Sequence, residues 1–232
     1  MAYDLEEQEQ LASMKAFWNQ YGNLLTWVLI IVLGGYAAYN YWNYNQRTQA
    51  AEASAMYDQL QKALTAKDNV AVQRFATDVQ KKYARSAYAP MSALAAAKSA
   101  FDANDLKSAK AHLQWVVEHG NDEYQAIARL RLSGVLLDEK AYDEGLKVLA
   151  GPFLPQFSGA VADRKGDILV AQNKLAEARA AYAEALKAMD KKNPGRQLVQ
   201  LKLDAIGGTV VDPKAAEPNA AQPSAARPKA AA

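Results

Sequence analysis

The chain has 232 residues, of which 50% are hydrophobic, and its 27 basic and 25 acidic residues give a formal net charge of +2. This length accommodates one domain of ordinary size together with additional segments, and the apolar content is sufficient for a packed core. The basic residues are scattered among acidic ones, which argues against nucleic acid as a partner. The sequence contains no cysteine, which excludes a disulfide framework, a thiol nucleophile, a cysteine-ligated metal and a lipidated cysteine.

Residues 1–22 form an acidic segment that begins with MAYDLEEQEQ. Its carboxylates suit the first turn and the solvated face of a short interfacial helix, because acidic charge is favourable near a helix N-terminus. The segment lacks the positive charge with which a signal peptide begins, and the apolar run behind it ends in YNYWNYN without a small-x-small cleavage site. We therefore expect the apolar run to be retained.

The run LLTWVLIIVLGGYAAYNYW, residues 24–42, predicts a transmembrane helix over residues 23–44. No charged residue occurs from Ala16 to Gln46, and a helix formed by the run would be about 28 Å long, close to the ~30 Å of a hydrocarbon core. Aromatic side chains gather at both ends, as expected for a membrane interface: Trp18, Tyr21, Trp27, Tyr36, Tyr39 and Trp42. A helix buried in a soluble core is the alternative.

Small residues within the run, Gly34, Ala37 and Ala38, would let another transmembrane helix approach closely. Lipid-facing residues without a partner are an equally simple interpretation. Charge does not orient the span, because Lys15 precedes it and Arg47 follows it. We expect the helix to continue as a stalk to about Thr65 and residues 45–88 to hold this stalk and a degenerate capping repeat.

Three similar segments begin at Ala93, Ala128 and Asp163, and their matching small residues are offset by 36 and then by 33 residues. In each, two small residues twelve positions apart flank a polar turn, which would let two antiparallel helices cross closely. The small residues are Ala97 with Ala109, Ser133 with Gly145, and Gly166 with Ala178. The pattern resembles the tetratricopeptide repeat and predicts an all-α fold with an α-solenoid over residues 89–206. An Ala-rich helical bundle is the alternative.

Two departures limit the regularity of the repeats. Pro152 and its neighbours predict a break and an irregular loop, and a step of 36 residues back from the first repeat reaches Gln61 and Gln73, which are not small. One further helix is expected between Pro194 and Gly207. The Pro/Ala-rich segment 207–232 is expected to be disordered.

Sequence motifs for chemistry are lacking. His112 and His119 are seven residues apart, about 10 Å along a helix, too far to share a metal ion, and we interpret both as partly exposed helix residues. No phosphate-binding loop, nucleophile elbow or HExxH motif occurs. We expect no catalytic group, cofactor, bound metal or small-molecule substrate, and no enzyme activity.

The acidic stretch LEEQEQLASMKAFWNQYGN, the single span, the stalk and the imperfect repeats together resemble the YfgM family, the ancillary subunit of the SecYEG translocon. The resemblance covers about residues 1–206. It implies a protein of the bacterial inner membrane, with residues 1–22 in the cytoplasm and the repeats in the periplasm. It further implies partnership with SecYEG and a PpiD-type chaperone, and a role in passing exported proteins to periplasmic chaperones.

The first helices of stacked hairpins line a concave surface in helical-repeat proteins. The candidate groove residues on these helices are Ser99, Arg129, Arg131 and Lys165. Two other functions stay open: a tethered assembly factor for another cell-envelope complex, and an enzyme subunit whose chemistry lies in a partner chain.

Overall fold

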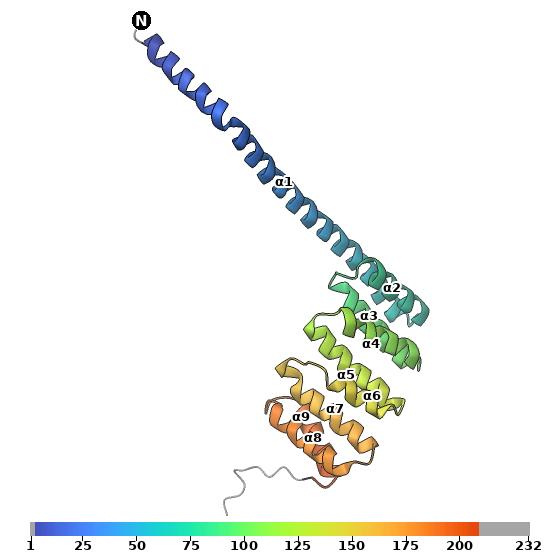
Figure 1. The fold of residues 1–232 in the computed structure, drawn as a ribbon. Helices are drawn as coiled ribbons and strands as arrows, with labels where there is room; N and C mark the ends of the chain where they lie inside the picture. Colours follow the sequence, from blue (N-terminus) through green and yellow to red (C-terminus); the bar gives the residue numbers. More distant parts are fainter. Residues whose placement is uncertain (1–2, 209–232) are drawn as a thin grey trace, which may run out of the picture. The chain divides into compact units, whose positions relative to one another are not determined.

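The computed structural model describes the backbone of residues 3–208 and the side chains of residues 7–208. The described residues form α-helices and one 3-10 turn, which confirms the all-α prediction (Figure 1). The predicted disordered segment lies outside the described residues from position 209 onward. In chain order the elements are α1 (Tyr3–Thr65), α2 (Asn69–Lys82), α3 (Tyr88–Asp102), α4 (Leu106–His119), α5 (Asp122–Asp138), α6 (Tyr142–Leu149), η1 (Pro155–Phe157), α7 (Ser158–Ala171), α8 (Leu175–Ala188) and α9 (Gly195–Ala205).

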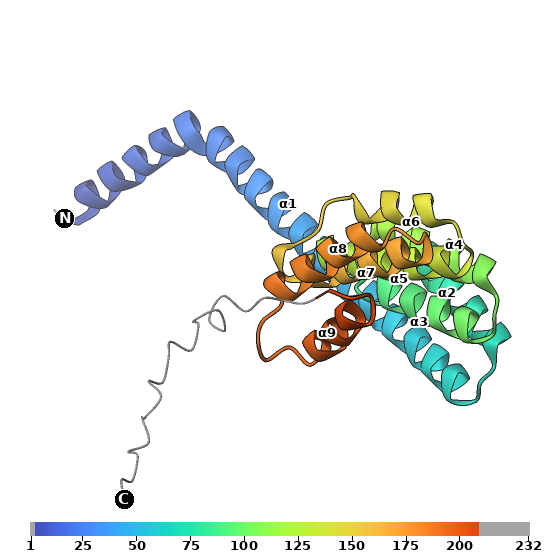
Figure 2. The same ribbon diagram turned by 90° about the horizontal axis from the view of Figure 1, so that it is seen from below.

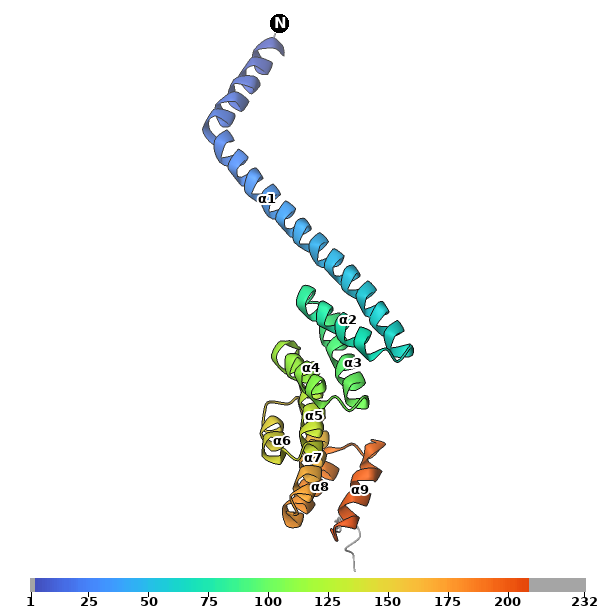
Figure 3. The ribbon, with the colours of Figure 1, turned by 90° about the vertical axis from the view of Figure 1, so that its right-hand side faces the viewer.

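The helices form two compact units, divided within α4 between His112 and Leu113. The predicted repeat domain over residues 89–206 therefore contributes to both units. In the first unit, the end of α1 packs against α2 and α3, as Figure 3 shows. Its core combines Leu60 and Ala63 of α1 with Val72 and Ala76 of α2, all buried.

The stalk ends at Thr65, as the sequence predicts, and a tight turn leads into α2. In this turn Lys67 has a left-handed φ of 56°, and its N–H donates to the Leu64 carbonyl while the Asp68 N–H donates to the Ala63 carbonyl. This pair of hydrogen bonds is a Schellman motif, which ends a helix by satisfying its last carbonyls. The Asp68 side chain then accepts from the Ala71 N–H and caps α2.

The same turn recurs after every first helix in the described chain. The left-handed residues have φ between 56° and 74°, and in each turn the N–H of this residue and the N–H of the next one donate to the same two carbonyl positions of the helix before it. They are Lys67, Asn104, Lys140, Asn173 and Gly207. The turn is therefore the most regular part of the repeat. The helix α9 also ends in this turn, so it corresponds to the first helix of a repeat.

The turns correct the sequence alignment of the first hairpin. Lys67 and Asn104 are 37 residues apart, so the positions equivalent to Ala97 and Ala109 are Leu60 and Val72. A step of 36 residues selects Gln61 and Gln73, one position away, on a different part of each helix. Leu60 and Val72 are fully buried but large, so this hairpin does lack the small crossing residues of the later ones.

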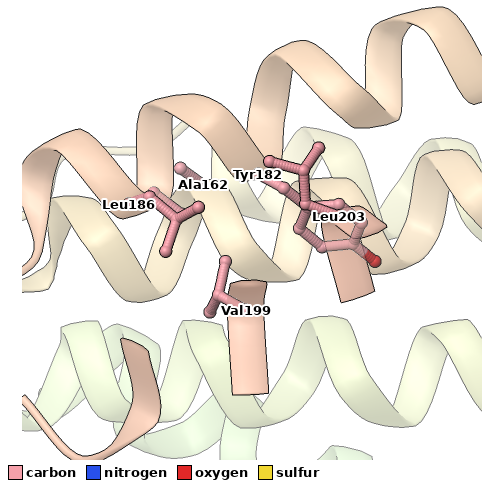
Figure 4. Close-up of a cluster of buried hydrophobic side chains, with 6 residues drawn as sticks. Ala162, Tyr182, Leu186, Val199 and Leu203 are labelled. Atoms are coloured by element: carbon pink, nitrogen blue, oxygen red, sulfur yellow. The ribbon is translucent and has the colours of Figure 1, made fainter. Parts of the chain in front are cut away.

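Two hydrophobic clusters lie among the described residues of the second unit. One lies between α5, α6 and α7 and contains Leu149, Val161 and Ile168. The other joins α7, α8 and α9 through the buried side chains shown in Figure 4, including Tyr182, Leu186 and Leu203. Figure 2 shows α9 joined to α8 by a loop, and the two helices are in contact.

The predicted break around Pro152 is present. The helix α6 ends at Leu149 after only 8 residues, and an irregular segment leads to η1 and α7. Proline lacks an N–H and its ring clashes with the preceding turn, so α6 cannot continue through this position.

Candidate membrane anchor and repeat surface

The predicted span is exposed along its whole length in α1. Large apolar side chains from Leu24 to Leu33 are exposed, and so are the predicted interface aromatics Trp18, Tyr21, Trp27, Tyr36, Tyr39 and Trp42. Within the described residues, α1 is the one helix long and apolar enough to cross a membrane by length and composition. A helix of a soluble core would be buried, so this alternative does not fit α1.

The small-residue face of the span is open. A Cβ atom added to Gly34 or to Gly35 would meet no atom within 4 Å, and Ala37 and Ala38 are exposed. A second transmembrane helix could therefore contact this face without displacing any part of the chain described here. That a partner helix occupies this face stays a prediction.

The small residues of the repeats all lie at buried positions: Ala97, Ala109, Ser133, Gly145, Gly166 and Ala178. Gly145 and Gly166 are the tightest. A Cβ on Gly145 would lie 3.1 Å from Ile168 Cδ1, and a Cβ on Gly166 would collide with the Tyr182 ring. Gly166 therefore requires the absence of a side chain where α7 crosses α8, whereas the tight contact of Gly145 is with the flexible end of Ile168 on α7, the first helix of the next hairpin.

Ser99 does not belong to an open groove. Its side chain is only 6% exposed, and its hydroxyl donates to Asn69 Oδ1 at the start of α2. The sequence placed Ser99 on the first helix of a repeat, but packing of α2 against α3 covers that part of the helix. Ser99 is thus a packing residue of the first unit.

Arg129 holds the irregular loop that follows α6. Its Nη1 donates to the Pro152 carbonyl at 2.7 Å, and its guanidinium lies 5.9 Å from the centre of the Phe153 ring. The side chain also contacts Gly151, whose Cβ position lies 3.2 Å from Arg129 Nε. A substitution at Arg129 would therefore disturb the loop as well as any partner surface.

Arg131 and Lys165 remain candidates for a partner surface. Arg131 on α5 is exposed, and Lys165 on α7 is half-buried. Both helices belong to the second unit, and they contact each other. Their contribution to partner binding is a prediction.

The sequence predicts that His112 is partly exposed on its helix, but the structure buries it. It is 8% exposed and lies between two glutamines of α2: Gln80 Nε2 donates to His112 Nδ1 at 2.8 Å, and His112 Nε2 donates to Gln73 Oε1 at 2.6 Å. Burial lowers the pKa of His112, since the charged ring would lose its hydration. These contacts fix the neutral ring between α2 and α4.

An ion-pair network that sequence reasoning missed joins the last three helices. Lys202 Nζ of α9 lies 2.8 Å from Asp163 Oδ1 and 2.7 Å from Asp167 Oδ1, both on α7. The Tyr182 hydroxyl of α8 donates to Asp167 Oδ1 at 2.9 Å. The four-residue spacing of the aspartates places them on one helical face, but no spacing relates them to Lys202, 39 residues beyond Asp163.

Burial and hydrogen bonding act against each other in this network. Burial disfavours the charge on Lys202, but the hydrogen bonds to Asp163 and Asp167 outweigh it, so the pKa of Lys202 is raised. Burial raises the pKa of Asp163, and the hydrogen bond from Lys202 only partly opposes this effect. The network orients α9 on α7 and leaves neither aspartate free for other chemistry.

Within the described chain, no group of three or more His, Asp or Glu side chains is arranged to hold a metal ion.

Comparison with known proteins agrees with this architecture. Residues 15–208 match a family described as a tetratricopeptide repeat-like domain. A protein of Neisseria gonorrhoeae is 35% identical over 89% of this chain and 100% of its own length, and it is named "Ancillary SecYEG translocon subunit". Relatives with the same name occur in Haemophilus influenzae (28% identity, 88% of this chain and 99% of theirs) and Escherichia coli (28%, 85% and 95%). No solved structure matches the chain significantly.

The exposed apolar helix and the hairpin repeats define a membrane-anchored protein of the helical-repeat class. The chain belongs to the YfgM family, whose curated members carry the translocon-subunit name. Members of this family are non-enzymatic proteins of the scaffold type, so the chain is not an enzyme.

Proposed function

We propose that this protein is an accessory subunit of the SecYEG translocon, held beside it by α1. The observation that carries the proposal is the exposed span with its open Gly34 face, in a chain that aligns along nearly the whole length of relatives named for that complex. A lone apolar helix would suffice as a tether. An uncovered glycine face additionally suits close contact with another transmembrane helix.

We further propose that the protein resides in the bacterial inner membrane, with residues 1–22 in the cytoplasm and the repeats in the periplasm. Residues 24–42 then cross the bilayer once, and the stalk carries the hairpins away from the membrane surface. The relatives' names and the one candidate span among the described residues support a membrane location, and the orientation rests on the resemblance to the family. The charges beside the span do not set the orientation, because they are balanced.

In this arrangement the repeats receive segments of exported proteins and pass them to periplasmic chaperones, with a PpiD-type chaperone as neighbour. Exposed Arg131 and half-buried Lys165 are the side chains proposed to contact a partner. Stacked hairpins suit this task because they present an extended surface without needing a deep pocket.

Photo-crosslinking in intact membranes tests the proposal directly. A photoreactive residue is placed at Ala38 or Tyr41, four and seven positions after Gly34 and therefore on its helical face, with Val32 on the opposite face of the span as the control. We expect adducts with translocon subunits from Ala38 and Tyr41, identified by mass spectrometry, and mainly lipid adducts from Val32. Lipid adducts alone from all positions would contradict the proposal.

The competing function is a tethered assembly factor for another cell-envelope complex. Replacing residues 24–42 with an unrelated span of equal length separates the two. A mere tether would keep its partners after the replacement, whereas a translocon subunit that uses this face would lose co-purification with SecYEG.

A further inference from the structure

A cavity of about 270 Å³ lies between α1 and the loop that joins α2 to α3. Trp42, Gln49 and Ala50 line it from α1, and Arg85 and Ser86 line it from the loop. All of these residues belong to the first unit. The Tyr83 hydroxyl donates to Glu52 Oε2 at 3.0 Å and so holds the loop against the stalk.

The cavity lies where the span leaves the membrane. Trp42 ends the apolar run, and the other α1 residues of the wall follow it by three to eight positions. At 1.5 Å per residue they extend about 4 to 12 Å beyond the hydrocarbon edge. The headgroup layer of one leaflet is roughly 5 to 8 Å thick, so the Trp42 end of the cavity lies at headgroup depth and the Ala50 end lies a few ångströms outside the layer.

The lining chemistry favours an anion. Arg85 is exposed and brings a guanidinium, which forms strong hydrogen bonds to phosphate oxygens. Ser86 lines the cavity, and its Oγ is buried without a hydrogen-bond partner within the described part of the chain, so this unused donor must turn toward the cavity to reach a ligand. Amide side chains, including that of Gln49, supply further donors.

The surrounding charge is mainly positive, and the acidic exception is Glu52, which accepts from the Tyr83 hydroxyl. From Trp42 to Ala51 the one charged residue is Arg47, and the loop segment KKYARSA, residues 81–87, carries three basic residues and no acidic one. The helix α3 begins directly after the cavity at Tyr88, and no side chain caps its N-terminus at Ala87. The positive end of a helix dipole therefore points toward the cavity.

We propose that this cavity binds the phosphate of an anionic phospholipid headgroup. Arg85 and Ser86 hold the phosphate oxygens, and the Trp42 indole contacts the glycerol end of the lipid. The volume is near the lower end of that of small-molecule sites, which suits a headgroup whose acyl chains remain in the bilayer. The site rests on α1 as a membrane anchor and does not depend on association with a translocon.

Native mass spectrometry of the full-length protein in detergent tests the site. The protein is titrated with dioleoylphosphatidylglycerol and, separately, with dioleoylphosphatidylcholine and inorganic phosphate. Arg85→Gln removes the guanidinium, and Ala50→Leu fills the cavity without a change of charge. Arg74→Gln removes an exposed arginine of the same unit that does not line the cavity. Circular dichroism and membrane flotation confirm the fold and the anchoring of each variant.

We expect phosphatidylglycerol to bind more tightly than phosphatidylcholine, and Arg85→Gln and Ala50→Leu each to weaken phosphatidylglycerol binding about fivefold to tenfold. Arg74→Gln should change it less than twofold. Equal losses in Arg85→Gln and Arg74→Gln would reduce the effect to general surface charge and overturn the site. Displacement of the lipid by millimolar inorganic phosphate would assign the cavity to free phosphate instead. Loss of SecYEG co-purification with intact lipid binding would count against the proposed function alone.

Discussion

At the scale of single residues, the closest helix crossings depend on side chains that are absent. Gly166 faces the ring of Tyr182, which is 2% exposed and anchored by its hydroxyl to Asp167, so the ring cannot move aside. Gly134 offers a contrast on α5, because a Cβ there would lie 3.6 Å from the Arg164 guanidinium, an ordinary contact. A side chain is therefore excluded by packing at Gly166 but not at Gly134.

Gly166→Ala should lower the free energy of unfolding by about 1 to 3 kcal/mol, because the added methyl group overpacks the contact with Tyr182. Gly134→Ala should raise it by about 0.5 to 1 kcal/mol, because alanine loses less backbone freedom in a helix and has room there. Denaturant unfolding of both variants measures the two changes. Equal and small effects would show that Tyr182 can yield.

Other residues show how burial changes a sequence interpretation. The sequence suggests that Ser99 and His112 are helix-surface residues, yet both are covered by α2: Ser99 is bonded to one of its amide side chains and His112 to two. The neighbouring sequence does not indicate the hydrogen-bond partners of such residues, because these partners lie 30 or more positions earlier in the chain.

At the scale of elements, His112 links the packing of α2 and α4 to pH. The ring is held neutral, with Nδ1 accepting from Gln80 and Nε2 donating to Gln73. Burial lowers its pKa below the ordinary 6.5, and the nearby charge of Asp105 opposes this only in part. Just below pH 6.5 His112 binds a proton in the unfolded chain but stays neutral in the folded chain. The stabilisation present above that pH is therefore lost as the pH falls through the lowered folded value.

We expect the opening free energy of α2 and α4 to decrease between pH 7.5 and pH 5.5, by up to about 1.4 kcal/mol per pH unit below 6.5. Hydrogen exchange of the full-length protein, corrected for the intrinsic rate, measures it. His112→Gln should flatten this dependence, whereas His119→Gln, which alters an exposed ring stacked on Trp115, should retain it. A slope unchanged in His112→Gln would refute the assignment.

The turns are the most uniform elements. A left-handed residue closes each first helix, and it is lysine or asparagine in four cases and glycine in the last. Asparagine and glycine tolerate this conformation, whereas lysine pays a steric penalty that the two hydrogen bonds of the turn offset. Small polar turns between helices were visible in the sequence, but the 37-residue offset of the first one was not.

At the scale of the whole molecule, the partner surface reduces to fewer side chains than the sequence suggested. Ser99 is buried and Arg129 holds the loop at Pro152. Exposed Arg131 is therefore the position at which a substitution tests partner binding most directly. Lys147 on α6 provides a matched control, because it is exposed on a second helix of the same unit, away from the proposed surface.

Arg131→Glu should weaken partner co-purification severalfold, since reversing one rim charge changes binding by about 1 kcal/mol. Lys147→Glu should have little effect, and neither variant should alter thermal unfolding. Affinity purification from solubilised membranes with quantitative mass spectrometry provides the comparison. Equal behaviour of the two variants would remove α5 from the proposed surface.

Local sequence patterns predicted the apolar span, the end of the stalk at Thr65, the three later hairpins, the break at Pro152 and the final helix. Each of these depends on hydropathy, helix period or turn chemistry within a few turns of chain, so neighbouring residues suffice to predict them. Tertiary structure alone decided the register of the first hairpin, the burial of Ser99 and His112, the loop contact of Arg129 and the pairing of Lys202 with Asp163 and Asp167. The physical reason is that the contacts join groups 23 to 39 positions apart, which helix packing alone brings together. The register of the first hairpin follows from the turn at Lys67, because its crossing residues are not small.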